Sequence, residues 1–319
     1  MAGREAAWAM LLGALLLAGG RVHAQPAFPA RPIQIVNPAP AGSISDTLLR
    51  ALAPGLQAKL GQPVAVVNRD GASGALGTAT VARAAPDGYT LLFTAAYTLS
   101  VLPVTRPDAG YRAEQIEPVC RTFVNTMALA VRPESPFTSL GDLVAAARAQ
   151  PGSLRFGHQG IASIPHLAMV ELAQAAGIQV QDVPYRGEPA AILDAMAGRV
   201  EFVSLVLGSL RGGALRPLAV FAERRHPLIP DVPTVPEAGF PVAPTSFGGL
   251  LAPAGLPVPV RQTLARACAG AAAEEVYAEA ARRGFQPLDY YADTEEFGRA
   301  LRRDVADKAR LLATVEVPR

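Results

Sequence analysis

The feature that most constrains the fold is an alternation of short β-rich runs with helical patterns. Strands are predicted at Ile33 to Asn37, Val64 to Val67 and Tyr89 to Thr94, with helical patterns between them. This β-α-β-α-β series is typical of half of a doubly wound α/β sheet, in which ligands lie beyond the carboxyl ends of the strands. The loops expected to face a ligand are Pro38 to Ser45, Asn68 to Gly74 and Ala95 to Ser100.

A second series, beginning near Met127, predicts a second α/β lobe. Its expected strands are 128–131, 154–157, 180–183, 201–205 and 215–221, and its expected helices are 139–150, 166–176 and 190–197. After a proline-rich stretch, the expected elements are a strand at 247–251 and helices at 258–273, 274–283 and 294–313. These are too few for a third domain. We therefore expect lobe 1 to comprise 25–124 and 244–319, lobe 2 to comprise 125–243, and a cleft to lie between them.

The first 24 residues are typical of a signal peptide. Arg4 precedes an apolar stretch from Ala6 to Ala18, and Val22-His23-Ala24 offers small residues around a cleavable bond. Because glycines and Arg21 interrupt the apolar run, it is too short for a membrane anchor, which needs about 20 apolar residues. The mature chain is expected to begin at Gln25 and to work in the periplasm.

Composition excludes some partners and leaves the cysteines open. Half of the 319 residues are hydrophobic and 18% are charged, as in a globular protein. The net charge is +2 and Lys59 and Lys308 are the only lysines, so nucleic acid is not an expected partner. Cys120 and Cys268 are far apart in the sequence. The favoured expectation is two separate buried thiols, and the alternative is a disulfide, which the periplasm permits.

Two glycine- and serine-containing segments resemble enzyme motifs only superficially. The spacing of Gly71, Gly74 and Gly77 is GxxGxxG, which indicates a tight turn before a helix and not a dinucleotide loop. Ser43 has no GxSxG context and is spaced from Asp46 as in a capping box. The helix that starts there contains Pro54-Gly55, which is expected to kink it. Neither a nucleotide nor a hydrolase nucleophile is expected.

The histidines offer little catalytic or metal chemistry at the level of sequence. His158 and His166 are eight residues apart, which is not a usual metal spacing, so neither a metal nor a cofactor is expected. His166 is expected to be a buried or capping residue. His158 follows a predicted strand in a cleft loop, where ligand contact and simple solvation are equally expected.

Several longer strings, taken in order, are far more specific than any single motif. They are Phe28-Pro29-Ala30-Arg31-Pro32-Ile33, Gly61-Gln62-Pro63-Val64 with Asn68-Arg69-Asp70-Gly71-Ala72, Pro86-Asp87-Gly88-Tyr89-Thr90-Leu91-Leu92, Val183-Pro184-Tyr185-Arg186-Gly187, Asp231-Val232-Pro233-Thr234-Val235-Pro236-Glu237-Ala238-Gly239 and Leu250-Leu251-Ala252-Pro253-Ala254-Gly255. The ordered set resembles the Bug-type extracytoplasmic receptors of tripartite tricarboxylate transporters over nearly all of the mature chain.

The resemblance implies a two-lobe periplasmic-binding-protein (Venus-flytrap) fold of type II-like form, whose lobes close on a carboxylic acid. It also implies capture through backbone amides more than through arginine side chains, which helix N-termini make physically sensible. Such a site needs small residues. Candidates in three cleft loops are Gly42 and Ser43, Ala95 and Ala96, and Gly160 to Ser163.

This chain departs from the family pattern at several of these positions. Ala41 stands where a second glycine is usual, His158 where a small hydroxyl residue is usual, and Ala162 where a glycine is usual. Leu205 follows a strand where relatives that take amino acids often carry an acidic or small polar residue. The segment from Tyr97 to Glu117 is also shortened. Ala41, His158, Ala162 and Leu205 join the candidate ligand-contacting residues.

The leading hypothesis is a binding protein that delivers a small carboxylate to membrane transporter subunits and performs no chemistry. It is expected to be a monomer. One alternative is a ligand-sensing partner of a membrane signalling protein, which the sequence does not distinguish. The other is a periplasmic enzyme on the same scaffold, for which His158 is the only plausible base.

Overall fold

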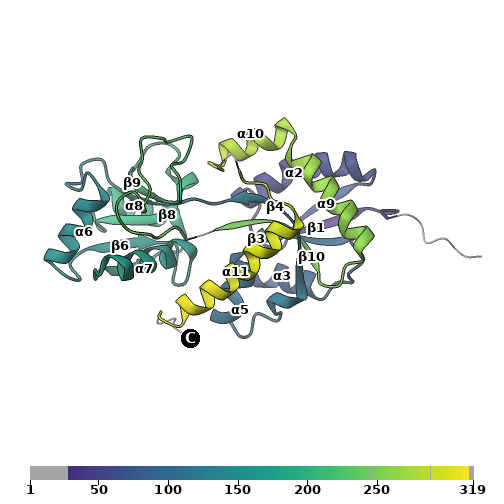
Figure 1. Cartoon of the computed structure of the whole chain (residues 1–319), viewed down its shortest axis with the longest axis horizontal. Helices are drawn as coiled ribbons and strands as arrows, with labels where there is room; N and C mark the ends of the chain where they lie inside the picture. Colours follow the sequence, from purple (N-terminus) through teal and green to yellow (C-terminus); the bar gives the residue numbers. More distant parts are fainter. Residues whose placement is uncertain (1–27, 245, 288, 316–319) are drawn as a thin grey trace, which may run out of the picture.

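The computed structural model describes residues 28–244, 246–287 and 289–315, and it consists of two lobes, each built on a five-stranded sheet (Figure 1). The predicted signal peptide lies outside the described residues. None of the described helices is long and apolar enough to cross a membrane.

The sheet of lobe 1 has the strand order β2-β1-β3-β10-β4. Parallel strands β1 (Ile33–Asn37), β2 (Val64–Asn68) and β3 (Thr90–Ala95) form one half, and β10 (Phe247–Pro253) pairs antiparallel with both β3 and β4 (Ile116–Val124). The helices around it are α2 (Ile44–Leu60), α3 (Ala75–Ala82), α4 (Tyr97–Ser100), α5 (Leu102–Thr105), α9 (Val258–Ala272), α10 (Glu275–Arg283) and α11 (Thr294–Leu312), with short 3-10 turns η1 (Ala72–Gly74) and η2 (Ala113–Gln115).

The sheet of lobe 2 has the equivalent order β7-β6-β8-β5-β9. Strands β6 (Arg155–His158), β7 (Gln181–Pro184) and β8 (Phe202–Val206) are parallel, and β5 (Met127–Val131) runs antiparallel between β8 and β9 (Arg216–Phe221). Its helices are α6 (Leu140–Ala149), α7 (Ile164–Ala176), α8 (Glu188–Met196) and the 3-10 turn η3 (Leu207–Leu210).

The chain crosses between the lobes twice, between β4 and β5 and again before β10 (Figure 1). β4 was not expected from the sequence, because Pro118 and Arg121 interrupt any regular alternation within it. Its pairing with β10 nevertheless extends along the whole of that strand. Gly249 of β10 has no room for a side chain, since a Cβ there would lie 2.1 Å from the carbonyl oxygen of Cys120.

The expectation of two separate thiols is wrong. Cys120 of β4 and Cys268 of α9 form a disulfide, with 6.6 Å between their Cα atoms, and both are fully buried. The reason lies in β4: by pairing with β10 it also packs against α9. The disulfide therefore ties two segments of lobe 1 that are 148 residues apart.

Helix α2 shows how the local sequence builds the first cleft loop. Ser43 caps it by accepting the amide of Asp46, and the apolar stripe that includes Leu52 and Leu56 faces the core. The helix continues through Pro54 to Leu60 without a break. The predicted capping box is only half formed, because the Asp46 carboxylate accepts the amide of Gly42 and not that of Ser43.

Candidate functional site

The three loops at the carboxyl edge of the lobe 1 sheet meet in space. Gly74, which ends the loop after β2, sits so close to its neighbours that a Cβ would lie 3.2 Å from the carbonyl oxygen of Pro38 and 3.3 Å from Cγ2 of Thr98. Pro38 follows β1 and Thr98 follows β3. This is the edge at which parallel strands place ligands. Gly74 itself has φ = 97°, in keeping with the predicted tight turn.

The loop before α2 holds Ala41, Gly42 and Ser43, and Ala41 and Gly42 are exposed. Gly42 has φ = 81°, a left-handed conformation that disfavours any side chain. Its amide donates to Oδ2 of Asp46 at 2.8 Å, so this amide is already used within the protein. Gly42 therefore shapes the loop but does not offer its own amide to a ligand.

Asp46 organises this loop from a buried position. Burial raises the pKa of Asp46, but hydrogen bonds from Arg50, Gly42 and Asn68 outweigh it and hold the pKa below its ordinary value. Nε of Arg50 lies 2.9 Å from Oδ2. The carboxylate is thus ionised and paired, and it fixes the turn that leads into α2.

Free donors lie one step further along, in the first turn of α2. In the described part of the chain, the amides of Ile44 and Ser45 have no hydrogen-bond acceptor, as the first amides of a helix require. The hydroxyls of Ser43 and Ser45 lie 3.2 Å apart beside them. Because the Ser45 hydroxyl also donates to Oδ1 of Asn37, both hydroxyls are engaged within the protein, and the two amides are the donor cluster at the N-terminus of a 17-residue helix.

The loop after β3 is anchored more firmly. Ala95 ends β3 opposite Gly248, and the amide of Ala96 donates to the carbonyl oxygen of Phe247 at 2.7 Å. Ala96 is buried and Ala95 is half-buried. These two residues support the wall of the loop, and the next amides, of Tyr97 and Thr98, have no acceptor among the described residues.

The corresponding loop of lobe 2, between β6 and α7, is held by the two histidines. Nδ1 of His158 lies 2.9 Å from the carbonyl oxygen of Gly160 and 3.2 Å from its amide nitrogen, and Ala162 donates its amide to Nδ1 of His166 at 3.2 Å. Ala162 has φ = 58°, which explains why relatives are expected to carry glycine there. Ser163 caps α7 by accepting the amide of His166. In this loop the amides of Gln159, Ile161 and Ile164 have no acceptor among the described residues.

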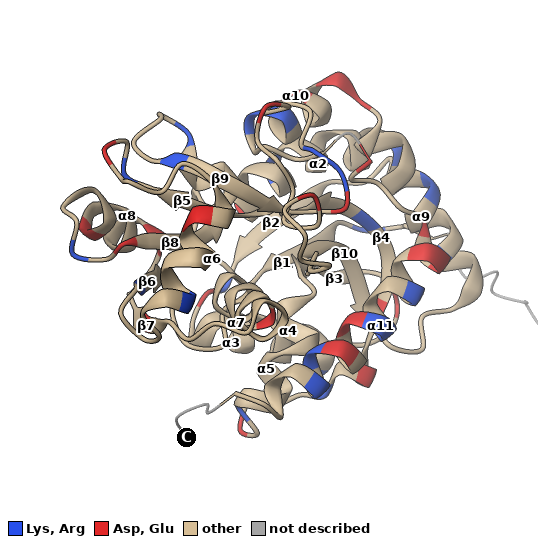
Figure 2. Ribbon diagram, turned by 60° about the vertical axis from the view of Figure 1, so that its left-hand side comes forward, with Lys and Arg blue, Asp and Glu red and all other residues tan. Residues whose placement is uncertain are grey.

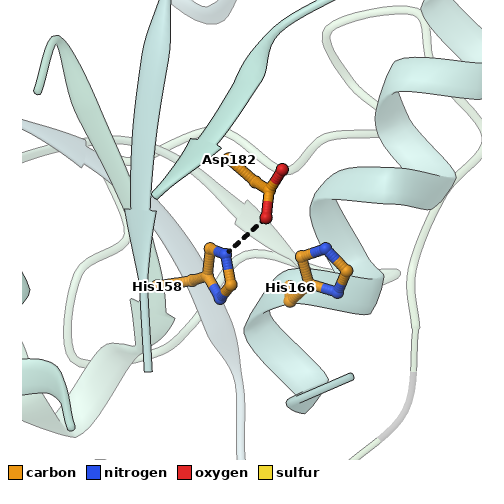
Figure 3. Close-up of side chains that lie close together, drawn as sticks. All are labelled: His158, His166 and Asp182. Carbon is orange, nitrogen blue, oxygen red and sulfur yellow. Dashed lines mark ion pairs between the residues drawn. The ribbon is translucent and has the colours of Figure 1, made fainter. Parts of the chain in front are cut away.

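His158, His166 and Asp182 point toward one another from β6, α7 and β7 (Figure 3). His158 is fully buried and not solvated, which removes one of its two expected roles. His166 is buried, as expected. Burial lowers the pKa of both imidazoles, and in His166 burial together with the charge of His158 lowers it to about 4. Both rings are therefore neutral at neutral pH.

Sequence reasoning missed Asp182 as a member of this group. The signal that could have found it is the parallel register of β6 with β7, which pairs Phe156 with Asp182. Because side chains alternate along a strand, Phe156, His158 and Asp182 then share one face of the sheet. The register depends on how the two strands pair in the folded protein. The local sequence pattern predicts the strands but not their pairing.

Leu205 and Arg186 occupy different environments. The side chain of Leu205 is fully buried within the hydrophobic cluster that includes Ala128 and Val220, so it faces the interior of lobe 2. Arg186 is exposed in the loop after β7, at the same edge of the sheet as the β6 loop. In the part of the chain that the structure describes, Arg186 has no ion-pair partner.

The two lobes approach each other at this edge. A Cβ on Gly208 of η3 would lie 3.1 Å from the carbonyl oxygen of Gly284 and 3.6 Å from the side chain of Ile44, both in lobe 1. Val101 of lobe 1 packs in the same hydrophobic cluster as Ala162 of lobe 2. The first turn of α2 thus faces η3. The segment after β3 in lobe 1 and the loop after β6 in lobe 2 lie at the same boundary between the lobes.

A cavity of about 610 Å³ lies near the crossings between the lobes. It is lined from both lobes, with Arg121 and Asp289 on one side and Arg224 and His226 on the other. Arg224 pairs with Asp289 at 2.9 Å, and Nε2 of His226 lies 3.1 Å from the carbonyl oxygen of Phe285. The region of the crossings therefore contains polar contacts between the lobes.

Comparison with known proteins shows what this chain is similar to. The protein BugT of Bordetella pertussis is 38% identical over 221 residues, which is 67% of this chain and 68% of that protein. A TctC solute-binding protein from Polaromonas, solved without ligand, has a TM-score of 0.80 and 29% identity, over 90% of this chain and 100% of that one.

Two further similar structures contain small acids. A protein of R. palustris solved with adipate has a TM-score of 0.77 and 26% identity, over 90% of this chain and 98% of that one. MatC from Rhodopseudomonas palustris, with bound malate, has a TM-score of 0.73 and 25% identity, over 89% of this chain and 99% of that one.

The model of the tripartite tricarboxylate transporter family receptor matches residues 48–316, which span both lobes and nearly all of the described chain. The fold, the loops at the interlobe boundary and the relatives agree with this match. The chain belongs to the tripartite tricarboxylate transporter receptor family.

Proposed function

We propose that this protein captures a small carboxylic acid between its lobes and delivers it to the membrane subunits of a tripartite transporter. The observation that carries the proposal is the donor cluster in the first turn of α2, where the amides of Ile44 and Ser45 lack acceptors. That turn faces Gly208 of the other lobe. A carboxylate held there gains hydrogen bonds and the positive end of a helix without burying a counter-ion.

Donors from the β6 loop complete the proposed site. The amides of Ile161 and Ile164 supply lobe 2, and the turns set by Gly42, Ala96 and Gly160 shape the pocket. Adipate in one similar structure and malate in another make dicarboxylates the first ligands to test. Arg186, exposed at the same edge, is the competing clamp, since arginine binds carboxylates bidentately.

The absence of catalysis is part of the proposal. Within the described residues, neither His158 nor His166 has its ring hydrogen-bonded to a hydroxyl or thiol, as an activated nucleophile requires. Incubating the protein with a bound acid and following the acid by NMR should return it unchanged. Steady conversion of the acid, lost on replacing His158, would instead favour an enzyme.

The proposal also covers where the protein works, how its chain is divided and what it binds. The proposal includes cleavage after Ala24, residence in the periplasm and a monomer that works without nucleic acid. It also includes the division of the mature chain into 25–124 with 244–319 and 125–243, which the membership of β10 in the lobe 1 sheet supports. Loss of acid uptake on deleting the gene separates transport from a sensing role, in which uptake would continue.

The binding test begins with a thermal-shift screen of mono-, di- and tricarboxylates, because a ligand selective for the folded state raises stability. An acid found in this way is then titrated against Gly42→Val and Arg186→Ala. Valine at φ = 81° distorts the turn into α2, so Gly42→Val should lower affinity at least tenfold. Arg186→Ala should lower affinity less than Gly42→Val does, and by less than the roughly 2 kcal/mol of binding free energy that loss of a bidentate arginine contact costs.

Gly61→Val is the matched control. Gly61 ends the same helix with φ = 66°, so the substitution imposes similar backbone strain far from the cleft, and binding should persist. If Arg186→Ala abolishes binding while Gly42→Val leaves it intact, the arginine clamp replaces the amide pocket.

A further inference from the structure

We propose that His158, His166 and Asp182 form a binding site for one divalent transition-metal ion of the zinc type in lobe 2. Each residue offers one ligand atom, and these atoms all lie within 4.8 Å of one another. The three side chains come from β6, α7 and β7 and point toward one another (Figure 3). The site is separate from the donor cluster proposed for the carboxylate.

The strongest indication is the orientation of His158. Its Nδ1 lies 2.9 Å from the carbonyl oxygen of Gly160, and the longer 3.2 Å contact is to the amide of the same residue. The shorter contact favours a proton on Nδ1, which leaves Nε2 with a lone pair. A metal-binding histidine donates its other ring N–H in this way.

The lone pair of Nε2 has no hydrogen-bond partner and is fully buried. It faces Oδ2 of Asp182 at 3.5 Å. Two acceptors directed at each other repel unless a proton or a cation lies between them, and 3.5 Å is too long for a good hydrogen bond. A metal ion satisfies both groups at once.

The distances suit a small ion after modest adjustment. Two ligands of one tetrahedral zinc, each about 2.0–2.1 Å from the metal, lie about 3.4 Å apart. The Nε2 to Oδ2 distance of 3.5 Å already meets this. The imidazole rings of His158 and His166 are 4.6 Å apart between centroids, and metal binding requires the ligand nitrogen of His166 to move closer to the other two ligand atoms.

The surroundings provide both a route and a supporting wall. A cavity of about 450 Å³ opens beside α7 and is lined by His166 and Asp182, so an ion can reach the ligands from solvent. Asp182 is 44% exposed, while Phe156 stacks against the rings of both histidines from the inside. Three protein ligands and an open side leave room for water on the metal.

The ligand types select the class of metal. Two imidazoles and one carboxylate suit zinc, nickel, copper or ferrous iron, whereas calcium and magnesium prefer oxygen ligands alone. Because His158 also contacts the backbone of Gly160 and His166 contacts that of Ala162, an ion here would stiffen the β6 loop. That consequence for carboxylate capture rests on the proposed function, but metal binding itself does not.

The test uses mature protein without a polyhistidine tag, stripped with a chelator and titrated calorimetrically with Zn²⁺, Mg²⁺ and Ca²⁺. We expect one Zn²⁺ per chain and no binding of Mg²⁺ or Ca²⁺. Asp182→Asn, at a partly exposed position that should tolerate it, is expected to lower Zn²⁺ affinity by about tenfold or more. Circular dichroism checks that the variant is folded.

Two control variants test the assignment to this site. Asp231→Asn removes an exposed carboxylate from a different loop, and His226→Gln removes the other described histidine; both should bind Zn²⁺ as the wild type does. The proposal is overturned if the stripped protein binds no Zn²⁺, if Asp182→Asn and Asp231→Asn bind equally well, or if His226→Gln loses binding. None of these outcomes depends on whether a carboxylate binds in the cleft.

Discussion

At the scale of single residues, Glu188 illustrates how a buried group at the edge of lobe 2 responds to pH. It begins α8, is 8% exposed, and accepts the amide of Val206 at 2.7 Å and the hydroxyl of Ser209. Burial raises the pKa of Glu188 from its ordinary 4.5, and the hydrogen bonds from Ser209 and Val206 offset only part of this. Glu188 thus links the start of α8 to the end of β8 that faces lobe 1.

The raised pKa of Glu188 predicts a loss of stability with rising pH. The folded protein holds this proton more tightly than the unfolded chain, so the stabilisation is present below pH 4.5 and is lost as pH rises through the folded-state pKa. Glu188→Gln cannot ionise and can keep both hydrogen bonds. In urea denaturation at several pH values, the variant should gain stability relative to wild type above pH 4.5. Parallel pH profiles for the two proteins would contradict this.

At the scale of elements, the disulfide joins β4 to α9 across the core of lobe 1. Both cysteines are fully buried, and β4 is one of the strands that carry the chain between lobes. Replacing both by alanine, Cys120→Ala with Cys268→Ala, should lower the free energy of unfolding by about 2–5 kcal/mol, because the unfolded chain loses a cross-link over a long loop.

Urea denaturation with and without a thiol reductant provides the measurement and its control for the disulfide. Reductant should destabilise the wild type to about the level of the double variant, and it should leave the double variant unaffected. Equal stability of oxidised wild type and double variant would show that the cross-link contributes nothing.

At the scale of the whole molecule, α11 reaches from lobe 1 to lobe 2. Acidic and basic residues intersperse along it (Figure 2), and most of their pairs are exposed. Lys308 is the exception: its side chain is 4% exposed, and Nζ lies 3.3 Å from Oε1 of Glu171 on α7. Burial raises the pKa of Glu171, and Lys308 opposes that rise.

We expect this interlobe pair to show measurable coupling. A double-mutant cycle with Lys308→Met and Glu171→Gln should give a coupling energy of about 1 kcal/mol or more, because each single change leaves a partly buried group without its partner. The exposed pair Glu295 with Arg299 on the same helix is the matched control, and it should show little coupling. Equal coupling in the two cycles would mean that burial between the lobes adds nothing.

Most strands and helices of both lobes, the two-lobe fold and the family could be predicted from the sequence. These follow from local periodicity, caps such as Ser43 and turns such as Gly74, and from ordered strings read along the chain. Their boundaries shift by one or two residues in the structure, as at β6 and α7, because helix and strand ends depend on neighbouring elements.

Which distant residues meet depends on contacts that form only in the folded protein. β4 lacks a regular pattern and exists because β10 pairs with it, and that pairing brings Cys120 to Cys268. Asp182 joins His158 and His166 only through the β6–β7 register. Likewise, the carboxylate of Asp46 accepts the amide of Gly42, while the amide of Ser43 donates to the carbonyl oxygen of Pro40. Strand pairing and competition for hydrogen-bond donors are non-local, so a pattern read along the chain does not contain them.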